Sequence, residues 1–112
     1  MNDYNPDYWQ VIKVTSTEGK VFYKVFGTWV GGYVQGESWR MNSGIKSVEE
    51  EGDYLLFHGF SGSTYKVVNK DFSYRTVLYT QSVLDYMMQK CDKVGAKMEL
   101  LPFDTNWKEL IV

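Results

Sequence analysis

The fold is decided by residues 8–26, which read YWQVIKVTSTEGKVFYKVF. In an extended chain, Trp9 and Val11 lie on one face of this stretch. Ile12 lies on the opposite face, together with every second residue before and after it. The same alternation returns over residues 20–26. Between the two runs, residues 16–19 read STEG, which is a turn signal. The stretch therefore predicts a β-hairpin.

Glycines and aromatic rings are concentrated before residue 66, which holds nine of the ten glycines and thirteen of the nineteen aromatic residues. Rings pack well on a half-buried sheet, and glycine supplies its turns and bends. Residues 38–48 and 54–60 predict a second hairpin, and residues 64–68 predict a further strand. The segment 27–38 is either a bulged strand or a loop. Together these runs predict a strongly curved antiparallel sheet or small barrel of five to six strands.

The pattern changes after Asn69. Apolar residues recur at helical spacing up to Val94, with Thr80 or Ser82 as the expected N-cap and Gly95 just past the end. We expect this helix, Thr80–Val94, to pack on the sheet.

The remaining residues predict a last strand at 97–101 and a short terminal helix that carries Trp107. The predicted fold class is α+β, with a flexible arm at residues 1–7 and a single domain at residues 8–112.

Composition argues against several classes of protein. The net charge is −2 and the pI is about 5.3, whereas readers of duplex DNA and proteins of membrane surfaces usually carry excess Lys and Arg. Cys91 is the only cysteine, so an intramolecular disulfide and a cysteine metal cluster are excluded. The polar, acidic start does not resemble a signal peptide. We expect a cytoplasmic protein with no cofactor, no metal and no membrane partner.

His58, the only histidine, is the one candidate general base. On the predicted strand 54–60 it shares a face with Tyr54 and Leu56. A base needs a group that orients it, and no second histidine exists to build a metal site. We therefore favour a structural histidine, and an enzyme that uses His58 is the least favoured alternative.

The turn at Ser61, Gly62 and Ser63 approaches the G-x-S-x-G nucleophile motif but ends in serine and is followed by a strand instead of a helix. The favoured interpretation is a tight hairpin turn. Its amides are also a candidate anion-binding nest.

A glycine-interrupted segment carries the candidate binding residues Trp29, Tyr33, Trp39 and Arg40. Simple alternation does not bury all of these rings, so they are candidates for an exposed anchor. Rings next to cations also occur in proteins that bind single-stranded nucleic acid, which is the alternative function. Adjacent strand residues point to opposite faces, however, and the acidic pI disfavours that alternative.

Residues 39–45, WRMNSGI, and 59–65, GFSGSTY, resemble small accessory proteins of tailed bacteriophages that are largely uncharacterised. The resemblance implies a virus-encoded protein that works in the host cytoplasm, and it implies no site residue. Taken together, the sequence predicts a non-catalytic binding module. Its expected partner is a host or viral protein, and a homodimer is the other expected assembly.

Overall fold

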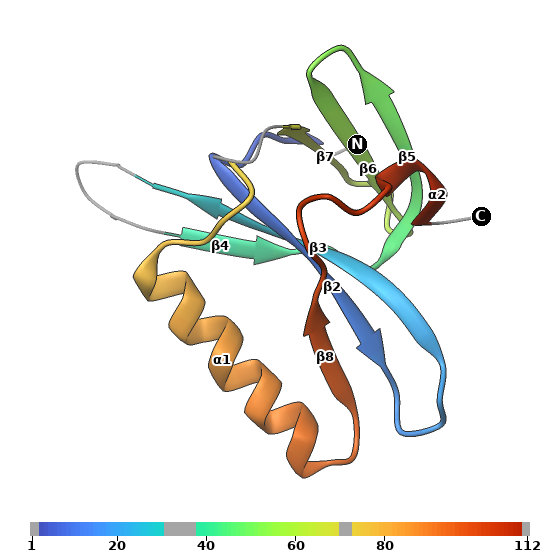
Figure 1. The fold of residues 1–112 in the computed structure, drawn as a ribbon, viewed down its shortest axis with the longest axis vertical. Coiled ribbons are helices and arrows are strands. Elements are labelled where there is room, and N and C mark those ends of the chain that lie inside the picture. Colours follow the sequence, from blue (N-terminus) through green and yellow to red (C-terminus); the bar gives the residue numbers. More distant parts are fainter. Residues whose placement is uncertain (1–2, 31–37, 70–72, 111–112) are drawn as a thin grey trace.

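The computed structural model describes residues 3–30, 38–69 and 73–110 (Figure 1). Neither of its two helices is long and apolar enough to cross a membrane. The elements follow in the order β1 (Asp3–Tyr4), β2 (Tyr8–Thr15), β3 (Val21–Trp29), β4 (Ser38–Met41), β5 (Ile45–Glu51), β6 (Tyr54–Gly59), β7 (Thr64–Val68), α1 (Leu78–Lys93), β8 (Lys97–Leu100) and α2 (Trp107–Leu110).

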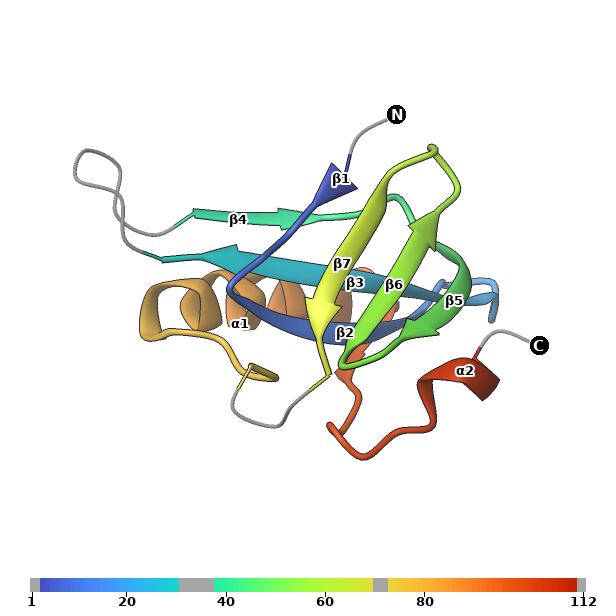
Figure 2. The same ribbon diagram turned by 90° about the horizontal axis from the view of Figure 1, so that it is seen from above.

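The strands form two four-stranded sheets, which lie against each other. The outer sheet has the order β1-β7-β6-β5, and the central sheet has the order β4-β3-β2-β8. In Figure 2 the outer strands β5, β6 and β7 lie in front of the central sheet, and α1 lies behind it. The α+β class is confirmed. The predicted single curved sheet or barrel of five to six strands is wrong, because within the described residues eight strands divide between two sheets that are not closed into a barrel.

The chain passes from the central sheet to the outer sheet at residues 42–44, inside the predicted strand 38–48. Gly44 has a φ of +146°, a conformation that residues with a side chain rarely adopt. This bend ends β4 and starts β5 in the other sheet. The second hairpin is therefore formed by β5 and β6 alone, with Gly52 at its turn.

The predicted hairpin at residues 8–26 is confirmed as β2 and β3, which pair from Tyr8 with Thr28 to Thr15 with Val21. Trp9 and Val11 pack into the core between the two sheets, whereas Ile12 packs against the helix. The central sheet is thus buried on both faces.

Aromatic rings fill much of the core between the sheets. The Trp9 ring lies 5.6 Å from Phe57, 4.8 Å from Tyr74 and 5.3 Å from Trp107, measured between centroids. Trp107 belongs to α2, so the predicted terminal helix is confirmed and closes this core.

The second core lies between the central sheet and α1, where Leu84 meets Ile12 and Phe26. The predicted helix is confirmed, and Gly95 follows its end with a φ of +84°. The predicted N-caps are wrong, because the helix starts earlier, at Leu78, and its N-cap Val77 makes no side-chain bond. Thr80 is instead buried, where its hydroxyl lies 3.4 Å from that of Thr28.

The predicted last strand is confirmed as β8, which pairs with β2 at the rim of the central sheet. The described part of the predicted arm, residues 3–7, is packed against the fold. Asp3–Tyr4 pairs with β7 in parallel, Pro6 is buried, and the Asp7 carboxylate accepts a hydrogen bond from the amide of Val30 at 2.9 Å.

Asn42 holds the junction between the sheets. Its buried Oδ1 accepts the amide of Val25 at 2.9 Å, and its own amide donates to the Val25 carbonyl at 3.1 Å. We expect Asn42→Ala to lower the free energy of unfolding by about 1–3 kcal/mol, because the buried amide loses its acceptor. Urea denaturation measures the effect. Asn69→Ala, at an exposed asparagine, should stay within about 0.5 kcal/mol of wild type, and equal stability of the two variants would contradict this role.

Candidate functional site

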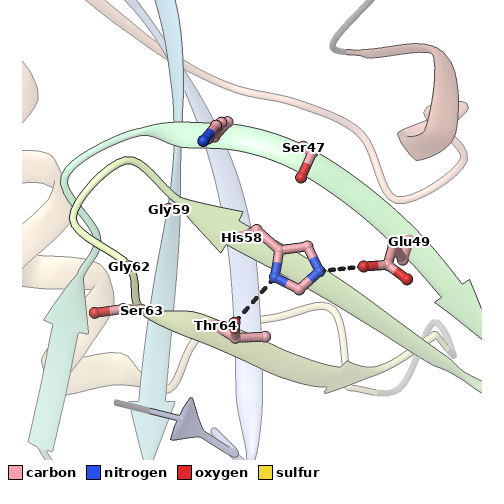
Figure 3. A pocket seen from close by; sticks show the side chains of 8 residues that line it. Ser47, Glu49, His58, Gly59, Gly62, Ser63 and Thr64 are labelled. Carbon is pink, nitrogen blue, oxygen red and sulfur yellow. Dashed lines mark hydrogen bonds and ion pairs between the residues drawn. The ribbon is translucent and has the colours of Figure 1, made fainter. Parts of the chain in front are cut away.

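A shallow pocket of about 400 Å³ lies on the face of the outer sheet that points away from the core (Figure 3). It is formed by β5, β6, β7 and the turn between β6 and β7. Its lining residues are Lys46, Ser47, Glu49, His58, Gly59, Gly62, Ser63 and Thr64. The strand register of β5 shifts between Ile45 and Ser47, and such an irregularity changes the direction of the neighbouring side chains.

His58, on β6, lies in this pocket between Glu49 of β5 and Thr64 of β7. Its Nε2 is 2.5 Å from the Glu49 carboxylate, and its Nδ1 is 3.0 Å from the Thr64 hydroxyl (Figure 3). A carboxylate only accepts, so Nε2 carries a hydrogen; in the neutral imidazole Nδ1 then accepts the hydroxyl proton. His58 therefore has the orienting partner that the sequence did not reveal.

The positions of the two turns that flank β6 are sufficient to predict these partners from the sequence. With turns at residues 52–53 and 61–62, strand register places Thr64 opposite His58 and Glu49 diagonally across from it. Pairing between neighbouring strands cannot be read from the residues of one strand alone.

A hydroxyl, an imidazole and a carboxylate in sequence also occur in acyl-transfer enzymes, which need amide donors for the oxyanion as well. In the adjoining turn, the amides of Gly59, Phe60, Ser61 and Gly62 all donate to acceptors within the protein. The Glu49 side chain is also 67% exposed, so water screens its charge. The three groups thus fit best as a polar link across β5, β6 and β7.

The same hydrogen bonds argue against the anion nest predicted at Ser61, Gly62 and Ser63. The amide of Ser61 donates to the Ser43 hydroxyl at 3.2 Å, and that of Gly62 donates to Gly59 at 3.1 Å. Two of the three amides of the predicted nest are thus already bonded within the protein. The predicted tight turn is confirmed, with a φ of +94° at Gly62.

The candidate binding residues that the structure describes, Trp29, Trp39 and Arg40, do not form one surface. Tyr33 lies outside the described residues. Trp29 packs against the core between the sheets, next to the ring of Tyr4 at 6.2 Å. Trp39 and Arg40, both on β4, remain exposed and point to opposite faces of the central sheet, as strand alternation predicts.

Trp39 lies on the helix side of β4. Its ring is stacked on that of the buried Phe26, with the centroids 5.4 Å apart and the planes at 19°. The side chain is nevertheless 39% exposed. The contact fixes the ring while leaving one surface of it open.

Arg40 lies on the other side of β4, where its guanidinium is 4.7 Å from the ring of Tyr4. That ring is in turn 5.0 Å from Tyr65, and burial raises the pKa of the Tyr65 hydroxyl to about 12, with Arg40 acting in the opposite direction. The Tyr65 hydroxyl is therefore neutral near pH 7 and does not neutralise the guanidinium. No described carboxylate lies within salt-bridge distance of Arg40.

We call β4, with the side chains of Trp39 and Arg40, the recognition edge. β4 is an edge strand of the central sheet, since β3 is its one neighbour in that sheet among the described residues. The sequence identified these two residues as candidates. Their position on a sheet edge depends on pairing with β3 and was not predicted.

Within residues 3–30, 38–69 and 73–110, no group of three or more His, Cys, Asp or Glu side chains is placed to hold a metal ion. Cys91 is half-buried on α1. Searches among protein families, curated proteins and solved structures found no match to this chain.

Proposed function

We propose that the protein is a non-catalytic interaction module that binds another protein through the recognition edge. The observation that carries this proposal is the pair Trp39 and Arg40, two exposed side chains that are each held in place by an aromatic ring. Trp and Arg are enriched among the residues that dominate binding energy at interfaces. Groups fixed before binding lose less conformational entropy when a partner arrives.

The resemblance of residues 39–45 to phage accessory proteins overlaps this edge. We therefore propose a bacterial or viral protein as the partner, in the cytoplasm of an infected cell. Binding of single-stranded nucleic acid has no comparable support. The exposed face of the outer sheet carries one ring beside a cation, Tyr54 with Lys66, but Glu49 and Glu51 lie on the same face and would repel phosphates.

The test is affinity capture from bacterial lysate with wild-type protein, Trp39→Ala and Phe22→Ala. Phe22 is a matched control, because it is 36% exposed and lies towards the end of the β2–β3 hairpin, away from the edge. We expect Trp39→Ala to capture at least about tenfold less of the partner protein than wild type, as truncation of a hot-spot residue does. Phe22→Ala should capture as much as wild type. Equal capture by all three proteins would contradict the proposal. Thermal melting verifies that each variant is folded.

A further inference from the structure

The backbone of the recognition edge presents free hydrogen-bonding groups. The amide of Asn42 donates to Val25 at 3.1 Å, and bonded pairs alternate along an antiparallel ladder. Arg40, two residues before Asn42, therefore also turns its backbone towards β3. By the same alternation, Trp39 and Met41 turn theirs away from β3, which is the one strand paired with β4 among the described residues. Outside the strand ladders, no described backbone carbonyl accepts their amides.

The side chains add a chemical pattern to this backbone. Residues directly opposite each other on paired strands share a face of the sheet. A strand added beside β4 would thus place one residue over the Trp39 ring and the adjacent residue next to the Arg40 guanidinium. The first position suits a β-branched or aromatic side chain, and the second suits a carboxylate.

The charge of Arg40 indicates whether the strand added beside β4 comes from a second copy of the chain or from a different protein. Two copies that pair antiparallel through the outward-facing residues of β4 have two registers of equal overlap, with Trp39 opposite either Met41 or Trp39 of the other copy. In the first register Arg40 faces Arg40 of the other copy, and like charges directly opposite each other are destabilising. In the second register Arg40 faces Ser38, so neither register places a carboxylate opposite it. An acidic segment instead supplies the carboxylate that Arg40 lacks among the described residues.

We infer that the recognition edge binds an extended acidic segment of another protein by strand addition. An Asp or Glu of this segment pairs with Arg40, and an adjacent apolar residue packs on Trp39. The inference rests on the proposed function and specifies how the partner is held: backbone hydrogen bonds give affinity, and the alternating side chains give specificity.

The test is selection from a displayed library of random peptides with the whole chain, comparing wild type with Arg40→Glu. Lys90→Glu, on the exposed surface of α1, is the control with the same change in net charge. Wild type and Lys90→Glu should enrich peptides with Asp or Glu next to an apolar residue. Arg40→Glu should enrich Lys or Arg at that position, and should bind the wild-type peptides at least about tenfold more weakly.

Failure to enrich any peptide, or an enrichment that does not change with Arg40→Glu, would overturn the inference. Peptides that require Trp39 and Arg40 but leave the amides of Trp39 and Met41 exchanging freely would overturn strand addition and leave the proposed function standing. Peptides that bind Trp39→Ala and Arg40→Glu as tightly as wild type would contradict both. A dimer of the free chain that Trp39→Ala dissociates would assign the edge to a second copy, against the inference.

Discussion

Trp9→Ala is expected to destabilise the protein by about 3–5 kcal/mol, the range for truncating a buried tryptophan. The side chain is 1% exposed and lies at the centre of the aromatic cluster between the sheets. Its indole also donates a hydrogen bond to the Val68 carbonyl at 2.9 Å, which ties β2 to the outer sheet. A domain of this size has a total stability of about 5–15 kcal/mol, so the variant should be close to unfolding.

Urea denaturation followed by circular dichroism measures this loss, since tryptophan fluorescence itself changes in the variant. Trp39→Ala is the matched control, because it removes the same side chain from a partly exposed site. We expect the control to lose less than half as much stability. A loss below about 1 kcal/mol for Trp9→Ala would contradict the two-sheet core.

Leu84→Ala is expected to lower the free energy of unfolding by about 2–5 kcal/mol. Leu84 is fully buried against Ile12 and Phe26, and it is the central contact between α1 and the sheet. Helix propensity does not oppose this expectation, because alanine is the better helix former. The whole loss therefore reports packing.

Tyr86→Ala on the same helix serves as the control. Tyr86 is exposed, so its removal should change stability by no more than about 0.5 kcal/mol. Thermal and urea unfolding of both variants provide the comparison. If Leu84→Ala were as stable as Tyr86→Ala, the helix would not form a second core on the central sheet.

Local features of the fold could be predicted from the sequence, and long-range features could not. The hairpin at residues 8–26 follows from a two-residue period and a turn, and α1 follows from helical spacing that ends at Gly95. The division into two sheets depends on which distant strands pair. The bend at Gly44 was hidden inside a run that resembles one strand.

At the candidate site, too, local features could be predicted from the sequence and long-range features could not. Adjacent positions in a strand predict that Trp39 and Arg40 point to opposite faces, and the structure confirms it. Trp29, from the same predicted patch, packs against the core because β3 is an inner strand of the central sheet. Burial of this ring depends on the outer sheet packing above it, which no local pattern encodes.

The most direct test of the recognition edge is amide hydrogen exchange of β4, measured residue by residue by NMR in the free protein and with a selected peptide. In the free protein the amides of Trp39 and Met41 should exchange at least about 100-fold faster than that of Arg40, which faces β3 opposite Gly27. The peptide should protect Trp39 and Met41 and leave Arg40 unchanged. Equal protection of all three amides in the free protein, or no change at Trp39 and Met41 on binding, would contradict an open edge that receives a partner strand.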